Sequence, residues 1–314
     1  MSLELTNHIL GRSQSLAAAR TFFAERGLLE VDCGALVPFP PLDSNIDVMS
    51  VSSGPNQTAY LHTSPEYAMK RLLAAGSPDI YFLGHVYRKG ELGYRHSPEF
   101  TMAEWYRIGI SFADMIEETG QFITHFTGPL PTRILPYRDA FTLYAGVNYS
   151  DDSPLALLSA AKRHAIDLPE NAQNWSRDTL LHLLLTHVVE PKLGQNEMTI
   201  ITDFPPYEAA LACVVEKKGE IVAERFEIYI QGLELANGYH ELSDPQELRR
   251  RFAEKNLARI EEGKEPYAID EKFLASLESG NFPDSCGVSV GFDRVLMLRY
   301  KLATIQETLY FPRN

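Results

Sequence analysis

Cysteine is scarce in this sequence, and its spacing excludes several kinds of protein. The three cysteines, Cys33, Cys213 and Cys286, lie far apart and form no CxxC pair. Such spacing indicates neither a zinc site nor a disulfide framework. Free thiols in a chain of this size suit a reducing cytosol, so we expect a cytoplasmic protein.

Targeting and membrane-spanning segments are also missing. The N-terminus has no cationic stretch followed by an apolar run, so no signal peptide is predicted. No run reaches the ~18 apolar residues of a membrane span, and there is no internal repeat or low-complexity tract. We therefore expect no membrane partner.

Basic residues are outnumbered: 29 Lys and Arg face 42 Asp and Glu, giving a formal net charge of -13. A protein that binds nucleic acid through its phosphates needs a basic face, so this balance disfavours tRNA as a partner without excluding a local basic patch. The 314 residues, 45% hydrophobic and 23% charged, are typical of a soluble globular chain with one large domain or two small ones.

Predicted strands come in runs, with helices between the runs, which favours an α+β fold around a mainly antiparallel sheet. Apolar spacing predicts a helix over residues 8–26, ended by Gly27. A second helix should begin at Ser64, with its hydroxyl as N-cap, Pro65 as the first helical residue and Glu66 in the first turn.

Two segments have the residue types of a nucleotide site. Arg88 ends a predicted strand, His96 lies in the following loop, and Phe100 begins the returning strand. A guanidinium can hold a phosphate bidentately, and an aromatic ring can stack on a planar base. In residues 287–294, small residues alternate on a strand, and Arg294 follows in the first helical turn, where a bound anion would offset its cost. An ordinary surface hairpin and a tight turn remain alternatives.

Acidic residues indicate a metal and a cationic substrate. Glu227 and Glu234 are seven residues apart, so on one continuous strand they would face opposite sides unless Gly232 or Gly238 bends the chain. Carboxylates beside a triphosphate typically hold Mg²⁺. For this acidic segment, a solvated acidic strand is the alternative. Glu66 and Glu104 suit a small cationic substrate, although Glu66 has an alternative interpretation as an acid at a helix start.

Together these segments resemble the class II aminoacyl-tRNA synthetases. Residues 22–38 look like motif 1, the dimer-interface helix and strand; residues 88–100 look like motif 2; and residues 287–294 look like motif 3, in the family's order. Three further segments resemble the lysine-specific subgroup, namely residues 63–66, 96–106 and 234–241.

Lysyl-tRNA synthetase carries an N-terminal anticodon-binding barrel, whereas motif 1 here begins within the first few dozen residues. The chain therefore resembles the truncated paralogues that form the elongation factor P–lysine ligase family. The resemblance implies one catalytic domain over residues 1–314 without an anticodon-binding domain, a homodimer, and use of ATP and Mg²⁺. It also implies that (R)-β-lysine or lysine is activated as an adenylate and joined to a lysine side chain of elongation factor P.

Two alternatives stay open. One is a stand-alone synthetase-like enzyme that uses tRNA or a small amine as acceptor. The other is a catalytically silent regulatory paralogue, which the presence of Arg88, Glu234, Glu241 and Arg294 disfavours.

The resemblance also implies residue roles. Arg88 and Arg294 are the expected catalytic residues. The ATP site should contain Arg88, Lys89, Gly90, His96, Ser97, Phe100, Glu234, Leu235, Gly291 and Arg294. The amino acid should contact Ser64, Glu66, Glu104, Tyr106, Asn237, Glu241 and Ser289. Mg²⁺ should be held by Glu227 and Glu234.

Three positions depart from the synthetase pattern. Lys89 and Gly90 replace Asn-Glu after the motif 2 arginine, so the glutamate moves to Glu91. Ser97 stands where asparagine is usual. Ser289 stands where the synthetase has glycine and the ligase alanine, which predicts a narrower amino acid pocket.

Overall fold

The computed structural model describes residues 3–41, 46–55, 57–150 and 153–311. It divides into two compact units, each of which contains strands and helices. The first takes the chain up to Gly128, then Ala210–Cys213, and then everything from Gly238 on; the second takes Pro129–Ala209 and Val214–Asn237. The predicted α+β class is confirmed. Within the described residues, no helix combines the length and the apolar character needed to cross a membrane.

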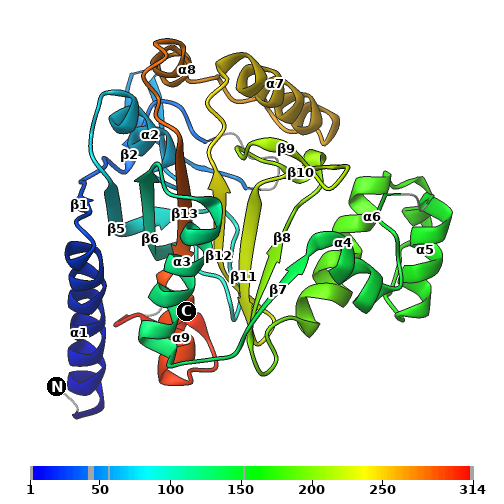
Figure 1. The fold of residues 1–314 in the computed structure, drawn as a ribbon, viewed down its shortest axis with the longest axis horizontal. Coiled ribbons are helices and arrows are strands. Elements are labelled where there is room, and N and C mark those ends of the chain that lie inside the picture. Colours follow the sequence, from blue (N-terminus) through cyan, green and yellow to red (C-terminus); the bar gives the residue numbers. More distant parts are fainter. Residues whose placement is uncertain (1–2, 42–45, 56, 151–152, 312–314) are drawn as a thin grey trace. The chain divides into compact units, whose positions relative to one another are not determined.

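The first unit is built on strands in the order β1-β5-β6-β13, followed by the end of β12 (Figure 1). β1 runs parallel to β5, whereas β5, β6 and β13 pair antiparallel. Its elements are α1 (Leu3–Glu25), β1 (Leu29–Glu30), β2 (Leu36–Val37), β3 (Met49–Gly54), β4 (Gln57–Leu61), α2 (Glu66–Ala74), β5 (Ile80–Tyr87), β6 (Glu99–Ile108), α3 (Phe112–Thr127), α7 (Pro245–Glu261), α8 (Glu271–Glu278), β13 (Ser285–Gly291), α9 (Phe292–Tyr300) and a 3-10 turn (Ile305–Thr308). β2, β4 and β3 form a small separate sheet.

Alternation along β5 and β6 divides the first unit's core into two layers, because successive strand residues face opposite sides. On one face, Tyr81 stacks on Phe23 of α1 at 4.3 Å, and Trp105 packs against the same ring. Phe122 of α3 completes this aromatic layer.

The opposite face carries Ile80, Phe82, Met102 and Tyr106, which pack in one cluster with buried side chains of α2, α7 and α8. This is the face that also bears Glu104. The candidate site therefore lies on the side of the sheet that α2 covers.

Helix starts follow the sequence with one correction. Ser111 caps α3, accepting from the backbone N–H of Asp114 at 3.1 Å. The N-cap of α2 is Pro65 rather than Ser64. The Ser64 hydroxyl still accepts from the N–H of Glu66 at 3.0 Å, so it satisfies a helix-start donor from one position farther out.

The second unit has strands in the order β12-β11-β8-β7, with β7 and β8 parallel and β8 and β11 antiparallel. Its elements are β7 (Thr132–Pro136), α4 (Tyr137–Ala140), a π-helix (Phe141–Ala145), α5 (Pro154–Arg163), a 3-10 helix (Glu170–Asn174), α6 (Arg177–Leu184), a π-helix (Leu185–Val189), short 3-10 turns (Glu190–Lys192 and Pro206–Glu208), β8 (Met198–Thr202), β9 (Val214–Lys217), β10 (Glu220–Ala223), β11 (Arg225–Ile230) and the first part of β12 (Leu233–His240).

β11 and β12 form a hairpin whose turn includes Gly232, one of the two glycines where a bend was expected, whereas Gly238 lies within β12. The turn consists of Gln231 and Gly232, both with positive φ, 55° and 66°. Two such residues suit the tight turn whose twist matches that of the flanking strands. Glu227 and Glu234 therefore lie on neighbouring strands.

Candidate active site

The pairing of β6 with β13 brings predicted site residues together on one sheet face. Glu104 lies opposite Ser289, and Tyr106 lies opposite Gly287. Directly opposite residues in an antiparallel pair project to the same side. The return strand of motif 2 (β6) and the strand of motif 3 (β13) therefore form one continuous surface of the sheet.

A hydrogen-bonded set of polar side chains sits over this surface. The hydroxyl of Ser64 donates to Oε2 of Glu104 at 2.7 Å, and the hydroxyl of Tyr106 donates to Oε1 of Glu104 at 2.9 Å. Glu104 is thus held from two sides although it is buried. Of the predicted amino acid contacts, the structure joins Ser64, Glu104 and Tyr106 directly.

Glu66 and Glu241 join this set through a residue that the sequence did not single out, Lys70. Its Nζ lies 2.7 Å from Oε1 of Glu66 and 2.5 Å from Oε2 of Glu241. The side chains of Lys70 and Glu241 are each only 1% exposed. In the described part of the chain, Oε1 of Glu241 has no hydrogen-bond donor. A buried carboxylate oxygen without a donor is costly, and it marks where an external donor would bind.

Gly287 explains how a ligand could reach that oxygen. A Cβ at this position would lie 2.3 Å from the Tyr106 ring and 2.4 Å from Oε1 of Glu241. Any side chain here would have to displace both groups. The glycine of motif 3 therefore keeps the space beside Tyr106 and Glu241 open.

The cluster is strongly perturbed electrostatically. Burial and the neighbouring Glu66 carboxylate raise the pKa of Glu104 to about 8. Burial also raises the pKa of Glu241 to about 7, although the Lys70 cation opposes this. Burial alone would lower the pKa of Lys70, but the Glu241 and Glu66 carboxylates raise it above its ordinary value. Strongly perturbed groups gathered in one place are typical of functional sites.

The nucleotide residues of the first unit gather at the motif 2 loop. The guanidinium carbon of Arg88 lies 5.1 Å from the centre of the Phe100 ring. Its backbone N–H donates to the carbonyl of Pro98 at 2.9 Å, which ties the two ends of the loop together. Nε of Arg88 is buried and has no hydrogen-bond acceptor among the described residues, while Nη1 lies 3.8 Å from Oε1 of Glu91. An anion could therefore still bind this guanidinium.

Arg294 approaches the same loop from α9. Its Nε donates to the carbonyl of Arg95 at 3.3 Å. Partial burial lowers the pKa of His96, and the nearby cations of Arg294 and Arg88 lower it further. The Glu91 carboxylate opposes this shift. Two arginines and a histidine therefore share one region, where a polyphosphate would offset their mutual repulsion.

The other predicted ATP-site residues of the first unit lie in or beside the motif 2 loop. The N–H of Lys89 donates to the carbonyl of Asp47 at 2.8 Å. Gly90 has φ +80°, a conformation that side chains rarely adopt, and this accounts for glycine where the synthetase pattern has glutamate. Ser97 is buried, and Gly291 is the N-cap of α9.

Glu227, Glu234, Leu235 and Asn237 lie in the second unit. Nη2 of Arg225, another residue missed in the sequence, lies 2.5 Å from Oε1 of Glu227. Its Nε donates to Oδ1 of Asn237 at 3.2 Å. Asn237 thus belongs to the same network as Glu227, and Leu235 is buried.

Glu227 and Glu234 are the residues that would hold a magnesium ion, although the two oxygens of Glu227 already accept from Arg225 and from the Tyr229 hydroxyl. Burial raises the pKa of Glu227, opposed by Arg225 and reinforced by the charge of Glu234. Two carboxylates that repel one another can share a cation, and Mg²⁺ typically takes one or two carboxylates plus phosphate oxygens. The described residues contain no group of three or more His, Cys, Asp and Glu placed to hold a metal, so phosphate oxygens would have to complete the shell.

Comparison with known proteins agrees with this geometry. Residues 1–314 match the family described as tRNA synthetases class II (D, K and N). The chain belongs to this class II synthetase family.

Three similar curated proteins are named elongation factor P–(R)-beta-lysine ligase. The protein from Haemophilus influenzae Rd is 40% identical over 315 positions, covering 99% of this chain and 96% of the relative. That from Haemophilus ducreyi is 40% identical, covering 96% and 93%, and that from Pasteurella multocida is 38% identical, covering 97% and 94%. The resemblance inferred from the motifs is thereby confirmed.

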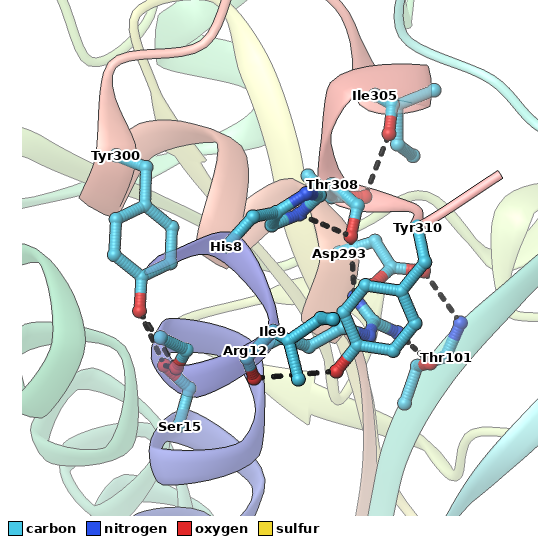
Figure 2. Close-up of polar contacts among 11 residues, drawn as sticks. His8, Ile9, Arg12, Ser15, Thr101, Asp293, Tyr300, Ile305, Thr308 and Tyr310 are labelled. Carbon is cyan, nitrogen blue, oxygen red and sulfur yellow. Dashed lines mark hydrogen bonds and ion pairs between the residues drawn. The ribbon is translucent and has the colours of Figure 1, made fainter. Parts of the chain in front are cut away.

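A buried arginine outside the three motifs ties the class II core together (Figure 2). Arg12 of α1 donates to Oδ1 of Asp293 at 2.6 Å and to the hydroxyl of Thr101 at 2.7 Å. The N–H of Thr101 donates to Oδ2 of Asp293 at 2.8 Å. Asp293 precedes Arg294 and Thr101 follows Phe100, so one guanidinium fixes the two segments that carry these predicted ATP-site residues.

Replacing Arg12 by methionine should lower the free energy of unfolding by about 3–5 kcal/mol, because it leaves the Asp293 carboxylate buried without its cation. Denaturant unfolding measures this. Arg20→Met is the matched control on the same helix: its pair with Glu30 is exposed and should be worth less than about 1 kcal/mol. Equal losses in both variants would contradict a special role for the Arg12 network.

Proposed function

We propose that this chain activates (R)-β-lysine, or lysine, as an adenylate with ATP and then transfers it to a lysine side chain of elongation factor P. The observation that carries the choice of amino acid is the Lys70–Glu241 arrangement. Glu66 and Glu241 share one resident ammonium, Glu104 is hydrogen-bonded beside them, and one Glu241 oxygen lacks a donor among the described residues. A substrate with two amino groups would balance this excess of carboxylates, whereas a neutral side chain would leave it buried and unpaired.

Activation needs little beyond positioning and charge neutralisation. The substrate carboxylate oxygen attacks the α-phosphorus of ATP, the bond to the bridging oxygen breaks, and pyrophosphate leaves. Arg88, with its unpaired buried Nε, would hold the carboxylate and the α-phosphate in line. Arg294 and His96 would meet the outer phosphates, and Phe100 would stack on adenine.

Glu227 and Glu234 would hold Mg²⁺, which neutralises charge on the phosphates when bound. Arg225 already pairs with Glu227, so the carboxylate is oriented before any metal arrives. This arrangement resembles the outer-sphere contacts that orient metal ligands elsewhere.

In the second step an uncharged lysine amine of the acceptor attacks the adenylate carbonyl. The bond to AMP breaks, AMP leaves, and the amine loses one proton to solvent as the amide forms. No covalent intermediate with the protein is required. Protein rather than tRNA is proposed as acceptor because the net charge of -13 offers no general attraction for a polyanion.

We also propose a cytosolic homodimer formed through motif 1, with residues 1–314 acting as one catalytic module. Three large apolar side chains around motif 1 are exposed, Leu10 at 52%, Leu29 at 55% and Leu36 at 51%. A symmetric partner could cover them. The three cysteines are all free thiols, in keeping with a reducing compartment. Sedimentation that shows only monomer at micromolar concentration would contradict the dimer.

The acceptor can be tested directly with labelled amino acid. The enzyme is incubated with ATP and labelled amino acid, in one sample with purified elongation factor P and in another with bulk tRNA. Elongation factor P should become labelled, and transfer to tRNA should be at least about 100-fold slower, because the acidic enzyme surface repels a polyanion. Elongation factor P with its target lysine replaced by arginine is the control and should stay unlabelled. Label on tRNA at an equal or higher rate would overturn the assignment of acceptor.

A further inference from the structure

Lys70 is a buried charged residue that the activation chemistry above does not use. It lies four residues after Glu66 on α2, a spacing that places both side chains on the same helix face. Lysine is almost never fully buried unless it is paired, and here one ammonium pairs with two carboxylates. Those two carboxylates come from different parts of the first unit, Glu66 from α2 and Glu241 from just beyond β12.

We propose that Lys70 is a positioning residue for the amino acid: its ammonium bridges Glu66 and Glu241 and fixes their remaining oxygens as acceptors for the substrate's amino groups. This inference rests on the proposed function, because it assigns Lys70 a role at the proposed amino acid site. The bridge uses Oε1 of Glu66 and Oε2 of Glu241. The other oxygen of Glu241, Oε1, is not used by this bridge and faces the space that Gly287 keeps open.

A second consequence concerns the charge of the site. Without Lys70, the buried Glu104 and Glu241 carboxyls would lie near Glu66 with no resident cation, and Glu241 would retain its proton to higher pH. The charged or titratable groups around Glu241 are Lys70 and Glu66 of α2, Tyr106 of β6 and His240 of β12, with Glu104 hydrogen-bonded to Tyr106. The Cys213 thiol donates to the backbone carbonyl of Glu241 rather than to its carboxylate. Of these groups, Lys70 is the cation in direct contact with the Glu241 carboxylate.

The test is ATP–pyrophosphate exchange driven by (R)-β-lysine, measured from pH 6 to 9 for the wild type, Lys70→Met and Lys70→Gln. Methionine removes the charge and the donors, whereas glutamine removes the charge and keeps an amide donor. Arg71→Met is the control, because Arg71 is the next residue on the same helix and is exposed.

At neutral pH both Lys70 variants should raise the KM for β-lysine at least about tenfold, while the KM for ATP stays within about twofold. The rise of kcat/KM with pH should move upward by about one to three pH units, the range expected when an adjacent opposite charge is removed. Arg71→Met should match the wild type in all three quantities. A purely structural lysine would not move the pH profile in this way.

A KM and a pH profile like those of the wild type in either Lys70 variant would overturn the proposal. Loss of the folded state in both variants would also overturn it, in favour of a purely structural ion pair. Failure of the proposed function looks different: the wild type itself would then show no β-lysine-dependent exchange. The same variants would then be measured with whichever amino acid does drive exchange.

Discussion

Arg294→Ala should slow ATP–pyrophosphate exchange at least about 100-fold. Removing a guanidinium from a phosphate clamp costs on the order of 3–5 kcal/mol when the partner charge stays buried, and each 1.4 kcal/mol is a factor of ten in rate. The structure places Arg294 at the motif 2 loop, where its Nε reaches the carbonyl of Arg95. The same substitution should raise the pKa of His96, because the Arg294 cation is one cause of its lowering. Titration of His96 by NMR therefore reports the local effect separately from the rate.

Arg299→Ala is the matched control for this experiment. Arg299 lies on the same helix, α9, and is exposed, with a hydrogen bond to the carbonyl of Phe126 at 3.2 Å. Its loss should leave exchange within about twofold, as for most surface substitutions away from special features. An Arg294→Ala protein that exchanges at the wild-type rate would remove motif 3 from the phosphate site.

The local chemistry of several segments was readable from the sequence because it depends on neighbours in the chain. The Ser111 cap of α3 and the strand–helix step into α9 are of this kind. So is the end of α1 just before Gly27, which has φ +75°. The N-cap of α2 is one residue later than the sequence predicted, because Pro65 takes the N-cap position. The Ser64 hydroxyl still accepts from the Glu66 N–H, from just outside the helix.

The geometry that long-range contacts create could not be read in the same way. Arg12 and Asp293 are 281 positions apart, and no local pattern links them. The hairpin that separates Glu227 from Glu234 depends on Gln231 adopting a positive φ, which glutamine rarely does without support from the surrounding structure. Lys70 did offer a local hint, since it follows Glu66 by four residues on the same predicted helix. Its second partner, Glu241, comes into contact only through the fold.

The substitution expected to separate amino acid binding from nucleotide binding is Glu241→Gln. The change keeps the shape of the side chain and removes the charge. Lys70 remains paired with Glu66 at 2.7 Å, so the resident ammonium is not left alone. A substrate ammonium, however, would lose the carboxylate oxygen beside Gly287. Losing one partner of a buried charge pair costs about 3–5 kcal/mol, so kcat/KM for lysine or β-lysine should fall at least about 100-fold.

The KM for ATP should stay within about twofold, because Glu241 belongs to the acidic cluster and not to the motif 2 loop with Arg88 and Arg294. Glu271→Gln is a suitable control: it also neutralises one glutamate, but at an exposed position paired with Arg249. Exchange in this control should match the wild type for both substrates.

The pH dependence of Glu241→Gln gives the sharpest outcome. In the wild type, burial raises the pKa of Glu241 to about 7, so its carboxylate loses the proton as pH rises through neutrality. An ammonium substrate needs the ionised carboxylate. The value of kcat/KM should therefore increase as the pH rises through about 7 and should be low at more acidic pH. Glutamine cannot titrate, so this rise should vanish, leaving the later rise that comes from Glu104, whose pKa is raised to about 8. If the variant kept the rise near pH 7, or if neutral amino acids drove exchange as well as lysine does, Glu241 would not be the group that recognises the substrate's amine.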